Sequence, residues 1–178
     1  MQLTEVLKRG FVGGFIEGKR ESIYIDCLEE LNWNKRESEE LVSTIAFLYF
    51  SKNKKNIYVC FIGKNPVIST SKRKINVLRK RFKRAKYYNK EKEIINKNFS
   101  IGEFLDYPIC CIKRYVEDTL SYGQELISMP SAVRYLSELR GRDLFGISTD
   151  GDVTFAKYGF IPCSYNCPQA IKFIKKLR

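Results

Sequence analysis

The chain contains no histidine among its 178 residues. This absence excludes Ser-His and Cys-His nucleophile pairs, imidazole metal ligands and acid–base catalysis by imidazole. A metal ion would therefore have to be held by cysteine, carboxylate or backbone oxygen atoms. A general base would have to be a carboxylate, Lys, Tyr or a thiolate.

Long apolar runs are also missing. No uncharged apolar stretch reaches the roughly 18 residues that a membrane helix needs, so we expect no membrane partner. The first residues, MQLTEVLKRGFVGGF, lack the apolar core and small-residue cleavage site of a secretory signal. We therefore expect a cytoplasmic protein, a setting in which cysteine clusters are typical of metal or catalytic sites. A composition rich in Lys, Ile and Tyr would also suit a hyperthermophile, whose intracellular proteins do carry disulfides.

Acidic residues are scarce between positions 64 and 97. This stretch holds thirteen Lys and Arg but two Glu, and so carries +11 of the formal net charge of +12. Together with interleaved aromatic residues, it is a candidate surface for the backbone of a nucleic acid, with RNA favoured over DNA. The alternative is a solvated helix face. The candidate binding residues are Lys72, Arg73, Lys74, Arg79, Lys80, Arg81, Lys83, Arg84 and Lys86.

Apolar periodicity predicts an α+β protein that is mostly helical. One short buried strand is expected at 56–63, followed by a turn at 64–70, and a β-hairpin with an Asp-Gly turn is expected near the C-terminus. Helices are expected within 2–18, at 35–51 behind an Asn34 cap, and at 71–97, 108–120, 131–140 and 168–177.

Several boundaries remain open at this level. Residues 21–31 fit either a helix or a strand, and the hairpin is placed at 144–160. Ser100 and Glu103 match the capping box that starts a helix. We expect a helical part at 1–98 and a cysteine-containing part at 99–178, either as one compact domain or as two.

Six cysteines divide into two kinds. Cys27 and Cys60 lie in apolar segments and are expected to be core residues. The other four lie at the starts of two predicted helices, where the positive end of the helix dipole favours thiolate. We expect these four to form one cluster and to be the metal ligands: Cys110, Cys111, Cys163 and Cys167.

Adjacent cysteines are awkward for a single zinc ion. Neighbouring helical residues point about 100° apart, whereas two sulfurs on one zinc must lie within about 4 Å of each other. An iron–sulfur cluster is therefore favoured over zinc, because adjacent thiolates can bind different irons. Two disulfides, or four unlinked thiols, are the alternatives, and neither needs a cofactor. Candidate supporting residues around the cluster are Tyr107, Lys113, Arg114 and Ser164.

The segments LDYPICCIKRY and IPCSYNC resemble a mainly archaeal family of unknown function. That family shares a Gly-Tyr-Pro-x-Cys-Cys segment and a later Pro-Cys-Ser-x-x-Cys segment. In this chain Asp106 stands where the family has glycine, and Ile161 stands where many members have histidine. The resemblance covers the cysteine-containing part and implies that the cysteines act together, without implying a reaction. The residues carried over are Tyr107, Pro108, Cys110, Cys111, Pro162, Cys163, Ser164 and Cys167.

The sequence thus favours a nucleic-acid-associated protein with a four-cysteine metal or iron–sulfur site, with a role in RNA modification. A second interpretation is a non-catalytic thermostable module with disulfide or core cysteines. A third is a thiol redox enzyme in which Cys110 or Cys111 attacks. Whether the chain is an enzyme stays open at this level.

Overall fold

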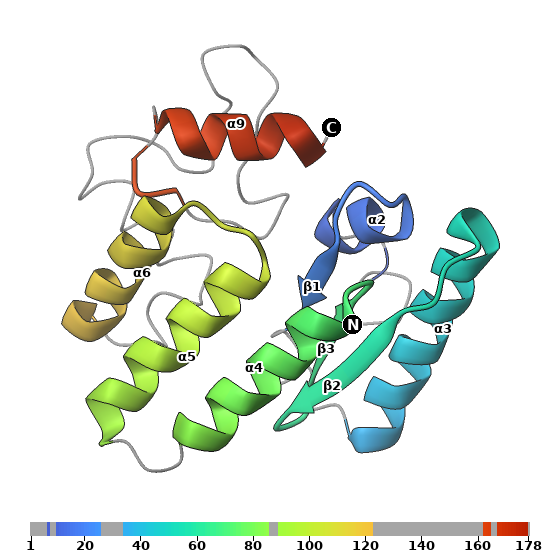
Figure 1. The fold of residues 1–178 in the computed structure, drawn as a ribbon, viewed down its shortest axis with the longest axis horizontal. Helices are drawn as coiled ribbons and strands as arrows, with labels where there is room; N and C mark the ends of the chain where they lie inside the picture. The colour runs from blue at the N-terminus through green and yellow to red at the C-terminus, as the bar shows by residue number, and fades with distance from the viewer. Residues whose placement is uncertain are drawn as a thin grey trace. The chain divides into compact units, whose positions relative to one another are not determined.

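The computed structural model describes residues 7, 10–25, 34–85, 89–122, 162–164 and 167–177. These residues belong to two compact units, Met1–Lys83 and Arg84–Arg178, and each unit is described by itself. Figure 1 labels their helices and strands. The expected helix at 131–140, the expected hairpin at 144–160, and residues Cys27 and Lys86 lie outside the described residues.

Unit 1 contains a three-stranded antiparallel sheet. Strand β3 (Asn65–Ser69) lies between β1 (Ser22–Tyr24) and β2 (Tyr58–Ile62). Ile62 pairs with Asn65, so β2 and β3 are joined by a two-residue turn. Gly63 in that turn has a φ of 60°, a conformation that glycine adopts without steric cost.

The predicted turn at 64–70 is wrong, because most of it forms β3. Every residue of β3 is buried, whereas in β2, at the edge of the sheet, only Cys60 is buried and the other residues are exposed or half-buried. The buried strand is therefore β3, and the strand expected at 56–63 is the half-exposed β2. Pro66 lies at the end of the pairing with β1, just beyond Val67, and its carbonyl still accepts a hydrogen bond from the N–H of Ile25 at 3.2 Å. Proline is tolerated at such an end because only one ladder bond is affected by its missing N–H.

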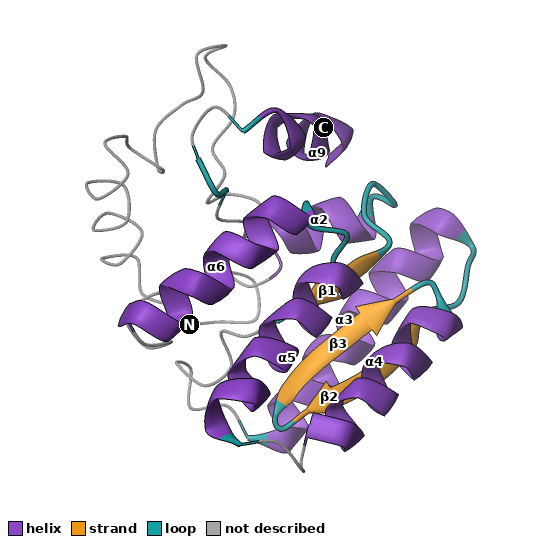
Figure 2. Ribbon diagram, turned by 60° about the vertical axis from the view of Figure 1, so that its left-hand side comes forward, coloured by secondary structure: helices purple, strands orange, loops and turns teal. Residues whose placement is uncertain are grey.

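Helices cover both faces of this sheet (Figure 2). On one face lie α2 (Gly10–Ile16) and α3 (Lys35–Asn53), and on the other lies α4 (Lys72–Ala85). The buried core between α2, α3 and the sheet consists of Val12, Phe15, Ile16, Ile23, Ile25, Leu41, Ile45, Tyr49 and Ile68. On the opposite face, Arg79 of α4 donates a 3.1 Å hydrogen bond to the Val59 carbonyl.

Helix α3 begins as predicted. Asn34 Oδ1 accepts a hydrogen bond from the N–H of Glu37 at 3.1 Å, and the Glu37 carboxylate accepts one from the N–H of Asn34 at 2.6 Å. This reciprocal pair satisfies two N–H groups that have no partner inside the helix. The predicted helix at 35–51 is confirmed, and it continues to Asn53 before Lys54 ends it in a left-handed conformation.

The single helix expected at 71–97 is instead two helices. The first, α4, ends at Ala85, and α5 (Lys90–Phe104) begins behind a new cap, Asn89, whose Oδ1 accepts from the N–H of Lys92 at 2.9 Å. The helix start expected at Ser100 is also wrong. Ser100 is buried inside α5, so its spacing from Glu103 has no capping role.

A tight turn connects α5 to α6 (Ile109–Tyr122). Tyr107 N–H donates to the Gly102 carbonyl at 2.9 Å and Asp106 N–H donates to the Glu103 carbonyl at 3.1 Å, which is a Schellman motif. Asp106 has a φ of 59°, in the left-handed region that favours glycine. This explains why glycine at this position fits the motif of the family that the sequence resembles.

The remaining described helix, α9 (Pro168–Leu177), confirms the prediction at 168–177. The helix expected at 108–120 is likewise confirmed as α6. Ala170 and Ile174, one turn apart, form the buried side of α9. Among the described helices, none is long and apolar enough to cross a membrane.

Candidate metal centre

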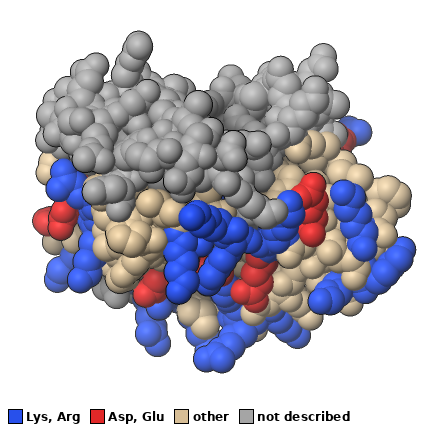
Figure 3. All heavy atoms as spheres, turned by 90° about the horizontal axis from the view of Figure 1, so that it is seen from above, with Lys and Arg blue, Asp and Glu red and all other residues tan. Residues whose placement is uncertain are grey.

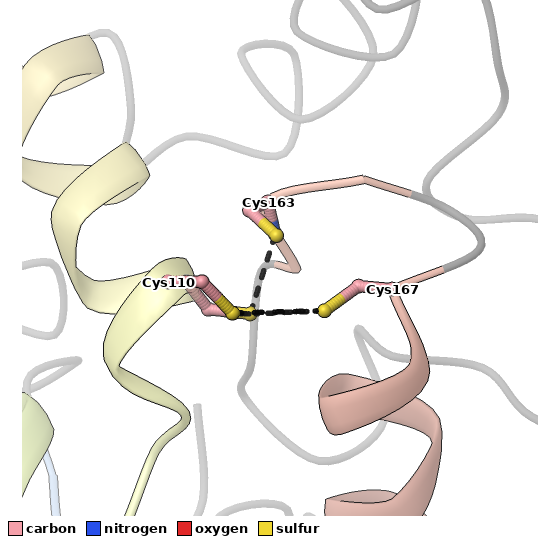
Figure 4. A group of neighbouring side chains, drawn as sticks. Cys110, Cys163 and Cys167 are labelled. Atoms are coloured by element: carbon pink, nitrogen blue, oxygen red, sulfur yellow. Dashed lines mark hydrogen bonds between the residues drawn. The ribbon is translucent and has the colours of Figure 1, made fainter.

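Four cysteines from two distant segments meet in unit 2. Cys110 and Cys111 lie in the first turn of α6, and Cys163 and Cys167 lie just ahead of α9. Figure 4 shows the side chains of Cys110, Cys163 and Cys167 converging, the first from α6 and the other two from the loop ahead of α9. All four Sγ atoms lie within 4.8 Å of one another, as the sequence predicts for one cluster.

Three of the four sulfur atoms are nearly equidistant from one another. Cys110 Sγ lies 3.8 Å from Cys111 Sγ and 3.7 Å from Cys167 Sγ, and the last two are 3.9 Å apart. A disulfide bond is about 2.05 Å long, so these pairs are not bonded. The described cysteines are all free thiols.

Adjacent helical positions do not separate the sulfurs of Cys110 and Cys111. The Cα–Cβ bonds of the two residues point in different directions. Rotation about each of these bonds nevertheless brings the two Sγ atoms to 3.8 Å from each other. The distance is inside the limit of about 4 Å for two sulfurs on one ion. The expected obstacle to a single zinc ion is therefore absent.

Helix starts place hydrogen-bond donors at two of the sulfurs. The N–H of Ala170, at the third position of α9, points to Cys167 Sγ at 3.5 Å. This sulfur occupies the place of an N-cap oxygen, and the positive helix end favours its thiolate. The N–H of Cys163 donates to Cys111 Sγ at 3.4 Å, so each buried sulfur has a backbone donor.

Burial and crowding shape the acidity of the thiols. Burial raises the pKa of Cys111 above its ordinary value; the Cys163 N–H acts in the opposite direction and the neighbouring thiols add to the rise. Burial also raises the pKa of Cys163. Burial opposes ionisation of Cys167 too, but the Ala170 N–H and the adjacent thiols outweigh it, so its pKa is lowered. Without a cation, therefore, the cluster cannot hold four thiolates at once.

The sulfur positions fit one tetrahedral ion. Four sulfurs at about 2.3 Å from a single ion occupy the corners of a tetrahedron whose edges are about 3.8 Å. The three distances among Cys110, Cys111 and Cys167, 3.7 to 3.9 Å, match such an edge, and Cys163 Sγ lies within 4.8 Å of the other three sulfurs. Thiolates on different irons of a cluster point away from its core and must stand further apart.

Apolar and amide groups surround the sulfurs. Tyr107 and Phe173 pack against the cluster with their rings edge to face, 5.4 Å between centroids. The Cys110 thiol donates to Gln169 Oε1 at 3.5 Å, a contact that the sequence analysis missed. The sequence feature that could have predicted this contact is the position of Gln169 in the first turn after Cys167, where a side chain faces the helix start.

The other supporting candidates have modest roles. The Ser164 carbonyl accepts from the N–H of Cys167 at 3.2 Å, which shapes the loop between the two cysteines. Arg114 pairs with the buried Asp118 at 3.1 Å, one turn along α6. Lys113 is exposed on α6.

Cys60 is separate from this cluster. It is buried on β2 in unit 1, as expected of a core cysteine. Burial raises the pKa of its thiol, partly offset by Arg79.

The basic residues expected to bind nucleic acid lie along α4, apart from Lys86, which is not described. Lys72, Arg73, Arg79, Lys80, Lys83 and Arg84 are exposed, whereas Lys74 and Arg81 are half-buried. Lys74 forms a 2.7 Å ion pair with Glu21, and Arg79 donates to the Val59 carbonyl. Arg79 is thus both exposed and bonded to β2, and the other exposed candidates are Lys72, Arg73, Lys80, Lys83 and Arg84.

Comparison with known proteins supports the resemblance seen in the two cysteine segments. A family model described as "Protein of unknown function (DUF483)" matches residues 68–177. The uncharacterized protein MJ1106 of Methanocaldococcus jannaschii, an archaeon, is 37% identical over 76 residues, which cover 42% of this chain and 36% of that protein. The match therefore spans about a third of the relative's length, and no solved structure matches the chain.

The family match begins in β3 and extends through α9, so it includes α4 and both pairs of clustered cysteines. It covers more than half of the chain. The chain belongs to the DUF483 family of proteins of unknown function.

Proposed function

We propose that this chain is a nucleic-acid-associated protein whose unit 2 is built around one tetrahedral metal ion, zinc, held by Cys110, Cys111, Cys163 and Cys167. The observation that carries the metal is the approach of four sulfurs to within 4.8 Å of one another. Thiolates are soft ligands that select zinc or iron over magnesium and calcium. The net charge of +11 over residues 64–97 supports an anionic partner.

A structural role for the ion follows from the number of ligands. Four protein thiolates complete a tetrahedral zinc site and leave no position for water or substrate. The cluster also packs against α9, because in the described part of unit 2 Cys111 and Cys167 are buried together with Ala170 and Ile174. An ion here would fasten the start of α9 to the start of α6.

Metal analysis of the full chain purified without oxygen tests this proposal. We expect one zinc per chain, no acid-labile sulfide, and a cobalt-substituted form with the absorption of a tetrahedral thiolate site. Cys163→Ser is expected to lower metal content strongly, whereas Cys60→Ala, which removes a buried thiol outside the cluster, leaves it unchanged. Acid-labile sulfide with several irons per chain would replace zinc by an iron–sulfur cluster. Metal-free protein with four titratable cluster thiols would overturn the metal site altogether.

A further inference from the structure

Helix α4 carries an unusually one-sided set of charges. Its 14 residues include eight Lys and Arg and no acidic residue. Ile75, Leu78 and Ala85 form its buried side. Four exposed cations of unit 1 lie on the opposite side, and we call them the outer face of α4: Lys72, Arg73, Lys80 and Lys83.

Two of the cations predicted for binding are occupied by the fold. Lys74 pairs with Glu21 at 2.7 Å, and Arg79 donates to the Val59 carbonyl at 3.1 Å. Both contacts hold α4 against the sheet. The outer face is therefore a smaller and more specific set than the charge run in the sequence indicates.

The first turn of α4 opposes the helix dipole. It contains Lys72, Arg73 and Lys74 and no acidic residue, although the start of a helix favours negative charge. By contrast, α3 has Glu37 and α5 has Glu91 and Glu93 in their first turns. The arrangement of α4 costs stability, which an anionic partner would restore.

Like charges also lie next to one another along the outer face. Lys80 and Lys83 are three residues apart, a spacing at which helical side chains are neighbours and like charges repel. Figure 3 shows the wider context: on the face drawn there, Lys and Arg cover more of the described surface than Asp and Glu do. Repulsion of this kind is relieved by an external anion.

We propose that the outer face of α4 binds the phosphate backbone of double-stranded RNA. This inference rests on the proposed nucleic-acid association and names its surface and its ligand. The four cations fall into two rows: Lys72 and Lys83 in one, and Arg73 and Lys80 in a second about 60 to 100° around the helix. The longer row extends about 16 Å along the axis, at 1.5 Å per residue.

Two cationic rows match the two rows of phosphates that border the narrow major groove of A-form RNA. Side chains cannot reach the base edges in that groove. The cations of the outer face would contact phosphates and not bases. Asn76 is the one uncharged polar side chain exposed on α4. The wide major groove of B-form DNA instead admits a whole helix, which reads bases with Asn, Gln and Arg. The surface therefore fits RNA shape and backbone.

Binding of the full chain to a duplex RNA, measured by fluorescence anisotropy over a salt series, tests the proposal. Four phosphate contacts predict that affinity falls roughly a hundredfold between about 50 and about 200 mM salt. The triple variant Lys72→Glu, Lys80→Glu, Lys83→Glu is expected to weaken binding at least tenfold and to reduce the logarithmic salt slope by about three.

The matched control is Lys52→Glu, Lys55→Glu, Lys64→Glu. It changes the net charge by the same amount as the first triple variant, at three exposed lysines of unit 1 that lie outside α4. We expect its affinity to stay within about threefold of the original chain, because only contacted phosphates release counterions. Circular dichroism and metal content, measured on all three proteins, confirm that each is folded.

The outcomes separate the inference from the function on which it rests. If the original chain binds RNA and both triple variants lose affinity equally, the effect is one of net charge. That result would overturn the outer face of α4 as the binding surface. Equal affinity for a B-form DNA duplex of the same sequence would overturn the assignment to RNA. Absence of RNA binding by the original chain, with one metal ion present, would overturn the nucleic-acid association and leave the metal site standing.

Discussion

In unit 1, the side chains that pack α2 and α3 against the sheet are Ile, Leu, Val, Phe and Tyr. In unit 2, the buried set beneath α9 consists, among the described residues, of Cys111, Cys167, Ala170 and Ile174. The first kind of core is stabilised by removing apolar surface from water, whatever else is bound. As far as the structure describes it, the second has two buried apolar side chains beside its two buried cysteines, and small cores commonly need a metal or another covalent or ionic constraint. The contrast predicts that the unit 1 core forms without metal and that the position of α9 depends on the metal ion proposed for unit 2.

Removal of the metal ion proposed for unit 2 should give the largest effect. Structural zinc contributes an apparent binding free energy of about 10–16 kcal/mol in zinc-finger peptides at neutral pH. Chelation should therefore expose the amides of α9 and of the first turn of α6 to rapid hydrogen exchange, while α3 remains protected. Hydrogen exchange with mass spectrometry measures both regions in one sample. Unchanged protection of α9 after complete loss of metal would break the comparison.

The next effect should come from the apolar core of unit 1. Leu41 is fully buried between α3 and the sheet, so Leu41→Ala leaves a cavity and should cost about 2–5 kcal/mol of unfolding free energy. All members of this core belong to unit 1, so metal content should stay at that of the original chain. Urea unfolding and metal analysis give the two values.

Phe47→Ala provides the control for the core variant. Phe47 lies on the same helix but is 72% exposed, so its loss should change stability by no more than about 0.5 kcal/mol. A large loss for Phe47→Ala, or metal loss in Leu41→Ala, would show that the two cores are not independent.

Some elements around these cores could be predicted from the sequence and others could not. The starts of α3 and α9 were predictable because Asn34 and Pro168 act locally, within the first turn of each helix. Strand β3 was not, because Asn65 and Pro66 favour a turn on their own. Burial between two helix layers overrides that preference, and it depends on residues far away in the sequence.

For the four-cysteine cluster, the grouping of the residues could be predicted from the sequence, but the positions of their sulfur atoms could not. The occurrence of four cysteines at two helix starts indicated one cluster. The preference for an iron–sulfur cluster assumed that Cys110 and Cys111 project apart, and side-chain rotation removes that separation. The distance from Cys110 to Cys167 depends on how α6 and α9 meet, which no local pattern encodes.

Close packing of α5 on α6 gives a smaller, sharper test in unit 2. A Cβ added at Gly102 would lie 2.7 Å from Ile112 Cγ1 and 3.2 Å from its Cγ2, so rotation of this branched side chain cannot relieve both contacts. Overpacking of this kind costs about 1–3 kcal/mol, whereas alanine gains up to about 1 kcal/mol over glycine in a helix. Gly102→Ala should therefore destabilise unit 2 by about 1 kcal/mol net.

Gly13→Ala is the matched control, because nothing lies within 4 Å of the added Cβ in α2. It should stabilise unit 1, by up to about 1 kcal/mol. Combining Gly102→Ala with Ile112→Ala should cost less than the sum of the two single changes, since the smaller side chain removes the clash. Additive losses would show that the contact at Gly102 is not the cause.

The smallest effect compares one change in both units. Asn34 caps α3 and Asn89 caps α5, each accepting a hydrogen bond from the N–H three residues later. Asn→Ala at either cap should cost about 1 kcal/mol. For Asn34→Ala, urea unfolding of unit 1 should show this loss with or without metal. For Asn89→Ala, the loss should be resolved in the metal-free protein. Once metal is bound, it should be a minor fraction of the total stability, because metal binding adds about 10 kcal/mol or more to the folded state. Equal dependence of both variants on metal would mean that unit 1 also relies on the ion, contrary to its apolar core.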